Sequence, residues 1–139
     1  MNIRDIMTTE LVTCTPNDTL MQVAQKMQSM DVGSCPVVDQ NTLVGIVTDR
    51  DITVRAISKG FDPNNTFVSD IMTPNPIYGS QYMSMEDACL LMQDNQIRRL
   101  PIVDNSRLVG IVTLADLAMD LDEDEILAET LEKISLPSH

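Results

Sequence analysis

One pattern of apolar and polar residues occurs twice in this chain of 139 residues. Each copy is an apolar run that ends in Thr, with Asp three residues later: LVGIVTDRD at 43–51 and LVGIVTLAD at 108–116. A short apolar run is typical of a buried strand, and Thr followed three residues later by an acid is typical of a helix N-terminus. Each copy therefore predicts a strand that turns directly into a helix.

The similarity between the two halves extends well beyond these runs. Residues 3–52 aligned on 68–117 agree at 16 of 50 positions, without a gap and at a constant offset of 65 residues. The tetrapeptide DIMT, for example, occurs at 5–8 and again at 70–73. The chain therefore contains an internal duplication. Because a single repeat of about 50–60 residues would be marginally stable alone, we expect the two repeats to share a core.

The expected order of elements in each repeat is strand, helix, strand, strand, helix. The two later strands form an antiparallel hairpin, and the first helix is a crossover that allows strands one and two to run parallel. The strands are expected at 12–14, 35–38 and 43–47 in repeat one, and at 77–79, 100–103 and 108–112 in repeat two. The fold class is thus α/β (α+β), with tandem β-α-β-β-α repeats related by a pseudo-twofold axis.

The helix boundaries follow from capping residues. Thr19 with Gln22, and Ser84 with Asp87, fit capping boxes at the start of the first helix of each repeat. The segment DVGS at 31–34 is expected to end the first of these helices, with Gly33 as its C-cap. The second helix of repeat one opens at Thr48, runs to about 58–59 and stops at Gly60, and its counterpart in repeat two opens at Thr113.

The predicted domains are residues 1–62, residues 63–121 and an acidic C-terminal segment, residues 122–139. The C-terminal segment has no counterpart in repeat one. Its first residues, DEDE at 122–125, suit a helix N-terminus, and Leu127, Leu131 and Ile134 form a narrow apolar stripe. We expect this helix to pack on the body or on another subunit rather than to form a dedicated partner site.

Composition and charge exclude several classes of function. The net charge of −12 would repel nucleic acid. Because no apolar run is long enough for a membrane span and the N-terminus does not fit a signal peptide, a cytoplasmic protein without a membrane partner is expected. Cys14, Cys35 and Cys89 lack zinc-site spacing and are expected to be small core residues. No catalytic constellation is present, so the chain is not expected to be an enzyme.

These motifs together resemble those of a pair of CBS domains, also called a Bateman module. The resemblance covers roughly residues 1–120 and rests on the DIMT segments, PVVD and PIVD at 36–39 and 101–104, and the GIVTxxD corners. The chain is similar to stand-alone bacterial two-CBS proteins of the stress- or hypoxia-response type. This resemblance implies a non-catalytic regulatory module that requires no cofactor, is often a homodimer, and binds adenosine compounds such as AMP, ADP, ATP or S-adenosylmethionine between its repeats.

The preferred ligand site is in repeat two. A Thr hydroxyl and an Asp carboxylate at a helix N-terminus can bind ribose and phosphate oxygens, although the same two residues also suit a simple helix cap. Two adjacent Arg residues can bind phosphate, unless they pair with surface acids. The expected contacts are adenine with Ile77, Tyr78, Leu100 and Pro101, ribose with Thr113 and Asp116, and phosphate with Arg98 or Arg99.

A weaker site is expected in repeat one, which lacks the Arg pair. It would use Val12, Cys35, Pro36, Thr48 and Asp51, and it would favour an uncharged adenosine-like group. Arg50 could serve the phosphate of the other site. The predicted function is a nucleotide sensor that signals by a conformational change, with an unidentified protein target possible. The alternative is a ligand-free dimerisation or protein-interaction module in which both Thr-x-x-Asp motifs are only helix caps.

Overall fold

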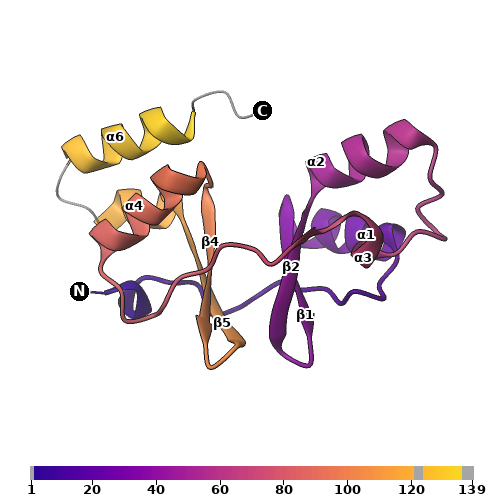
Figure 1. Ribbon diagram of the computed structural model, residues 1–139, viewed down its shortest axis with the longest axis horizontal. Coiled ribbons are helices and arrows are strands. Elements are labelled where there is room, and N and C mark those ends of the chain that lie inside the picture. Colours follow the sequence, from indigo (N-terminus) through magenta and orange to yellow (C-terminus); the bar gives the residue numbers. More distant parts are fainter. Residues whose placement is uncertain (1, 121–123, 136–139) are drawn as a thin grey trace. The chain divides into compact units, whose positions relative to one another are not determined.

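The chain forms two compact units (Figure 1). The computed structural model describes residues 2–120 and 124–135, with the backbone alone at 120 and 124–127. We call Val12–Pro76 the repeat-one unit. Met1–Leu11 together with Ile77–His139 is the repeat-two unit. Each unit has its own hairpin, its own helices and its own hydrophobic core, so the expectation of one shared core was wrong, and each unit is described separately below.

The elements of both units agree with the predicted order, so the mixed α+β fold is confirmed. The repeat-one unit contains α1 (Leu20–Met30), β1 (Ser34–Asp39), β2 (Thr42–Thr48), α2 (Asp49–Asp51) continued by η2 (Ile52–Ala56) and η3 (Ile57–Lys59), α3 (Val68–Ile71) and β3 (Thr73–Pro74). The repeat-two unit contains η1 (Ile3–Asp5), α4 (Met85–Asn95), β4 (Arg99–Asp104), β5 (Arg107–Thr113), α5 (Leu114–Asp120) and α6 (Asp124–Ile134).

Both antiparallel hairpins are present, and they have the same register. Ser34 faces Thr48 in one, and Arg99 faces Thr113 in the other. The strands predicted at 12–14 and 77–79 are each reduced to one parallel bridge, Cys14 to Val37 and Gly79 to Ile102. The parallel sense agrees with a crossover through the first helix of each repeat.

The helix termini agree in part with the capping predictions. At α1 the Thr19 N–H donates to Gln22 Oε1 (2.8 Å) and the Gln22 N–H donates to Thr19 Oγ1 (3.2 Å), so this box is complete. At α4 the structure shows one arm, from the Asp87 N–H to Ser84 Oγ (3.1 Å), and the Ser84 backbone pairs with Asn2 instead.

The predicted ends of the two repeat-one helices had different outcomes. Helix α1 ends at the predicted DVGS segment, but its C-cap is Asp31 and not Gly33. Asp31 occupies the left-handed region there, with φ 54°, a conformation that Asp tolerates better than most residues. Gly60 does end the second helix, with φ 77°.

The first residues of each repeat complete the other repeat's unit. Thr8 and Ile111 exchange backbone hydrogen bonds of 2.8 and 3.0 Å, so the first DIMT segment pairs with β5 at Thr8. Conversely, β3 pairs with β2 through Gly45 and Ile46. The expected boundaries at 62/63 and 121/122 therefore describe the sequence repeats, whereas the compact units divide the chain at 11/12 and 76/77.

The glycine of each hairpin motif makes this pairing possible. A Cβ on Gly110 would lie 2.5 Å from Met7 Sδ and 3.2 Å from the Thr8 carbonyl oxygen. A Cβ on Gly45 would lie 2.6 Å from Met72 Sδ and 3.0 Å from the Thr73 carbonyl oxygen. In both units, the Met of a DIMT segment occupies the space that a side chain on this glycine would need.

The three cysteines are buried and free, as expected of small core residues. Cys14 and Cys35 belong to the repeat-one core, and Cys89 belongs to the repeat-two core. The hydrogen bond with Cys35 and burial raise the pKa of the Cys14 thiol. Burial likewise raises the pKa of Cys89. The thiols of Cys14 and Cys89 are therefore protonated at neutral pH.

Helix α6 packs against α4, which confirms packing on the body (Figure 1). Ile134 is 7% exposed and joins the repeat-two core, and the Gln93 side chain donates to Thr130 Oγ1 at 2.7 Å in a buried contact. Asp122 and Glu123 lie outside the described residues, as does the side chain of Leu127. None of the helices in the described ranges has both the length and the apolarity needed to cross a bilayer.

Candidate functional site

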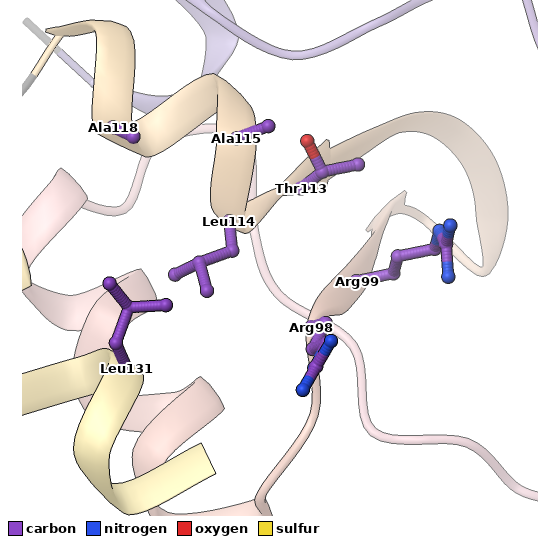
Figure 2. A pocket seen from close by; sticks show the side chains of 7 residues that line it. All are labelled: Arg98, Arg99, Thr113, Leu114, Ala115, Ala118 and Leu131. Carbon is purple, nitrogen blue, oxygen red and sulfur yellow. The ribbon is translucent and has the colours of Figure 1, made fainter. Parts of the chain in front are cut away.

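A cleft of about 560 Å³ opens in the repeat-two unit at the corner where β5 turns into α5. Figure 2 shows the side chains that line it. They come from the start of β4, from the β5–α5 corner and from α6: Arg98, Arg99, Thr113, Leu114, Ala115, Ala118 and Leu131. Three of them, Arg98, Arg99 and Thr113, are residues that the sequence assigned to the preferred site.

Backbone pairing holds the polar residues of this cleft together. Arg99 and Thr113 are register partners across β4 and β5. Next to this pair, the N–H of Leu114, which follows Thr113, donates to the carbonyl oxygen of Arg98, which precedes Arg99, at 3.0 Å. The equivalent bond in the repeat-one unit runs from the Asp49 N–H to the Gly33 carbonyl oxygen at 2.9 Å. The start of the first hairpin strand therefore lies beside the start of the helix that directly follows the hairpin, α2 in one unit and α5 in the other.

Thr113 and Asp116 form a complete helix cap. The Thr113 N–H donates to Asp116 Oδ2 (2.9 Å), and the Asp116 N–H donates to Thr113 Oγ1 (3.1 Å). The capping alternative is thus confirmed as a structural fact. It is compatible with a binding role, because the cap uses one carboxylate oxygen of the partly buried Asp116 and leaves Oδ1 as a further acceptor.

The cleft combines positive charge with an apolar wall. The side chains of Arg98 and Arg99 are exposed, and among the described residues neither lies within ion-pair distance of an acid. The other lining residues, which we call the apolar wall, are Leu114, Ala115, Ala118 and Leu131. Such an arrangement suits a molecule with an anionic end and a flat apolar end, since guanidinium groups bind phosphate with paired N–H donors.

The other predicted contacts of the repeat-two site lie outside the cleft lining, and these include Asp116, which reaches the cleft only through its cap with Thr113. Leu100 is fully buried in the core, and Pro101 is buried as well. Ile77 and Tyr78 are 41% and 59% exposed, in the segment that reaches β4 through Gly79. Contact between adenine and these four residues therefore stays a prediction, and the Leu100 side chain is available to a ligand only if the core rearranges.

Sequence reasoning missed the apolar wall. Leu114, Ala115 and Ala118 follow directly on Thr113, and their counterparts in repeat one are the polar residues Asp49, Arg50 and Thr53. That difference between the repeats was the available signal. Leu131 was recognised as part of an apolar stripe, but its place beside the β5–α5 corner depends on where α6 docks, which the sequence pattern does not specify.

The corresponding corner of the repeat-one unit is less suited to an anion. Thr48 and Asp51 form the same cap, with bonds of 2.9 and 3.1 Å. Here Asp51 Oδ1 also lies 3.6 Å from Arg55 Nε, so the second oxygen has a cation beside it. Gly33 replaces Arg98, and the Asp49 carboxylate comes so close that a Cβ on Gly33 would lie 3.1 Å from its Oδ2.

The remaining repeat-one candidates are mostly core residues. Cys35 is fully buried, Pro36 is buried, and Val12 is partly buried against the core. Arg50 is exposed, and its expected reach to the phosphate of the other site stays a prediction. In the ranges that the structure describes, no group of three or more His, Cys, Asp or Glu side chains could hold a metal ion.

A family model agrees with the duplication and with the corner geometry. The CBS domain model matches residues 3–57 and again 68–134. The chain belongs to the CBS-domain family. Each match contains one hairpin and one Thr-x-x-Asp corner, so the two sequence repeats are the two CBS repeats.

Curated CBS relatives resemble the chain over nearly their whole length. The CBS domain-containing protein YhcV of Bacillus subtilis is 45% identical over 134 residues, which are 96% of this chain and 95% of that protein. Hypoxic response protein 1 of Mycobacterium tuberculosis is 35% identical over 125 residues, 89% of this chain and 87% of that protein. The resemblance to two-CBS proteins of the hypoxia-response type is thereby confirmed.

Solved structures of CBS pairs share the fold. The structure of Hypoxic Response Protein I with two coordinated zinc ions has a TM-score of 0.80 at 34% identity and covers 87% of this chain and 99% of that one. CBSX2 in complex with AMP has a TM-score of 0.74 at 30% identity, covering 85% and 93%. The CBS pair of MJ0100 in complex with 5-methylthioadenosine and S-adenosyl-L-methionine has a TM-score of 0.75 at 29% identity, covering 86% and 94%.

Proposed function

We propose that this CBS pair is a non-catalytic regulatory module that binds an adenosine nucleotide in the cleft of its repeat-two unit. The observation that carries the proposal is the cleft itself, where the Arg98–Arg99 pair faces an apolar wall beside the Thr113–Asp116 corner. Phosphate would meet the guanidinium groups, and the ribose diol would donate to Asp116 Oδ1. Binding would change the conformation of the module and so signal to a protein target.

Two further findings support an adenosine ligand. Similar CBS pairs have been solved with AMP and with S-adenosylmethionine and 5-methylthioadenosine. The repeat-one corner of this chain has Asp49 and Gly33 where the repeat-two corner has Leu114 and Arg98. Because carboxylates repel an anionic phosphate, the repeat-one corner would bind a nucleotide more weakly, or would prefer an uncharged adenosine-like group.

A thermal-shift screen tests the proposal on the full chain. AMP, ADP, ATP, NAD and S-adenosylmethionine are compared with adenosine, which lacks the phosphate. A ligand at about 100 times its dissociation constant adds about 2.7 kcal/mol to the free energy of unfolding, which raises Tm by several degrees. AMP should shift Tm more than adenosine does, and the Arg98→Ala and Arg99→Ala variants should reduce that difference. No shift by any adenosine compound at millimolar concentration would contradict the proposal.

The second candidate function is a ligand-free interaction module. It is favoured by the complete caps at Thr48–Asp51 and Thr113–Asp116, which give both motifs a structural role without any ligand. The screen separates the two functions, because an interaction module would show no adenosine-dependent shift while it still assembled with a protein.

We also propose that the chain acts as a homodimer. The repeat-one unit leaves several large apolar side chains partly exposed, among them Val54 at 46%, Ile57 at 50% and Phe61 at 44%. A second subunit could cover such residues, which are rarely left exposed together on a monomer. Light scattering coupled to size-exclusion chromatography should give twice the chain mass of 15.4 kDa. A concentration-independent mass of one chain would contradict this.

A further inference from the structure

We infer that helix α6 is part of the nucleotide site, and that ligand binding and the docking of α6 on α4 stabilise each other. This inference rests on the proposed function. Leu131 of α6 is one of the cleft-lining residues, together with Leu114, Ala115 and Ala118 of α5. In Figure 2 the Leu131 and Leu114 side chains extend toward each other across the apolar side of the cleft. The apolar wall is therefore complete only while α6 is docked.

The contacts that dock α6 are separate from the residues that line the cleft. The Gln93 side chain donates to Thr130 Oγ1 at 2.7 Å, and Ile134 is 7% exposed in the repeat-two core. The Gln96 side chain also donates to the Lys133 carbonyl oxygen at 3.3 Å. Thr130 and Ile134 are one helical turn apart and face α4, whereas Leu131 precedes Ile134 by three residues and reaches the cleft.

The buried hydrogen bond between Gln93 and Thr130 fixes the register of α6 on α4, which apolar contacts alone would define less strictly. A Gln–Thr hydrogen bond inside an otherwise apolar interface is made in one register, because any shift of the helix would leave both groups buried without each other. The Thr130 hydroxyl also meets the Cys89 thiol. Docking in this register places Leu131 at the cleft.

Leu131 is 46% exposed, although its neighbour Thr130 is fully buried. A ligand whose base lies on the apolar wall would cover part of this exposed leucine surface. The binding free energy then contains a contribution from α6, so the affinity depends on whether α6 is docked. By thermodynamic linkage, the ligand must strengthen α6 docking by the same factor by which docking strengthens ligand binding.

The CBS repeat-one unit offers an internal contrast. Residues 122–134 have no counterpart in the first repeat, so its corner has no equivalent of Leu131. The coupling is thus specific to the repeat-two site, and it gives the protein a helix whose stability reports the occupancy of that site. A partner that recognises α6 or the surface beside it would sense the nucleotide.

The experiment compares AMP binding to four full-length proteins by isothermal titration calorimetry. In the Leu131→Ala variant the wall loses apolar surface, and AMP should bind about fivefold more weakly than to wild type. In Gln93→Leu the cleft lining is unchanged but α6 is less firmly docked, and AMP should again bind several-fold more weakly. Glu132→Gln is the matched control, since Glu132 is an exposed α6 residue outside the cleft, and its affinity should equal that of wild type.

Hydrogen exchange of the α6 amides gives an independent readout. AMP should slow the exchange of residues 128–134 in the wild-type protein, and should slow it less in Leu131→Ala. If AMP binds wild type but neither Leu131→Ala nor Gln93→Leu weakens it, and α6 exchange is unchanged or faster with AMP, this inference is wrong while the proposed function stands. If no adenosine compound binds the wild-type protein, the proposed function and this inference fail together.

Discussion

AMP is expected to bind the Asp116→Ala variant about tenfold to a hundredfold more weakly than the wild-type protein. Asp116 Oδ2 is used by the helix cap, and Oδ1 is the acceptor proposed for the ribose hydroxyls. Hydrogen bonds to a charged group contribute about 1.5–3 kcal/mol, which corresponds to this range of affinities. Isothermal titration calorimetry measures the effect. In the same variant the free energy of unfolding should fall by about 1 kcal/mol, because the Thr113 N–H loses its acceptor.

Asp116→Asn separates the ligand contact from the cap. The amide oxygen of Asn can still accept from the Thr113 N–H, so the free energy of unfolding should stay close to that of wild type. The second carboxylate oxygen is replaced by an NH₂ donor, so AMP binding should fall almost as far as in the alanine variant. Asp51→Asn, at the equivalent position of repeat one, should leave AMP binding nearly unchanged. If both Asp116 variants bind AMP as tightly as the wild-type protein does, Asp116 is only a helix cap and makes no contact with the ligand.

Gly110→Val should lower the free energy of unfolding by about 2–3 kcal/mol, as expected when a side chain is forced into a well-packed interior. A Cβ at this position would lie 2.5 Å from Met7 Sδ and 3.2 Å from the Thr8 carbonyl oxygen. The methionine side chain can move, but the Thr8 carbonyl is held by the Ile111 N–H. Urea denaturation should show a lower midpoint with a similar slope.

Gly60→Ala is the matched control for this glycine. A Cβ on Gly60 would meet nothing within 4 Å, but its φ of 77° disfavours any side chain. The expected loss is therefore about 1 kcal/mol and has a purely backbone origin. In addition, Met7→Ala should partly relieve Gly110→Val, since it removes the nearest clashing atoms. A wild-type urea midpoint for Gly110→Val would show that Met7 and Thr8 do not pack on β5 as described.

The hairpins and the corner helices followed from local pattern, whereas longer-range features did not. The apolar runs before Thr48 and Thr113 predicted β2 and β5, and the Thr-x-x-Asp spacing predicted both helix caps. The end of α1 was predicted within residues 31–34, but the C-cap was assigned to Gly33, because glycine is the usual terminating residue, whereas Asp31 adopts the left-handed conformation. The exchange of the DIMT segments could not be read from periodicity, because both copies are short and would suit either hairpin equally.

The candidate site was predicted for its polar half and missed for its apolar half. Arg98, Arg99 and Thr113 were predicted because the CBS resemblance, and two adjacent cations in an acidic chain, both indicate a phosphate site beside this helix N-terminus. Leu114, Ala115 and Ala118 are ordinary helix residues in the sequence, and only their position across from the Arg pair gives them a role. Leu100 was assigned to an apolar slot for adenine, but its side chain is fully buried in the repeat-two core.

The crossed positions of the two DIMT segments have a consequence for how a duplicated chain of this kind can originate. In a single ancestral copy, the glycine-containing strand of the hairpin would have had no DIMT segment packed on it. The DIMT segment of that copy would have had no hairpin to pair with. Two such copies could have paired both segments by exchanging them in a domain-swapped dimer. Joining the genes of that pair end to end would have turned an intermolecular exchange into an intramolecular one, without requiring a new contact.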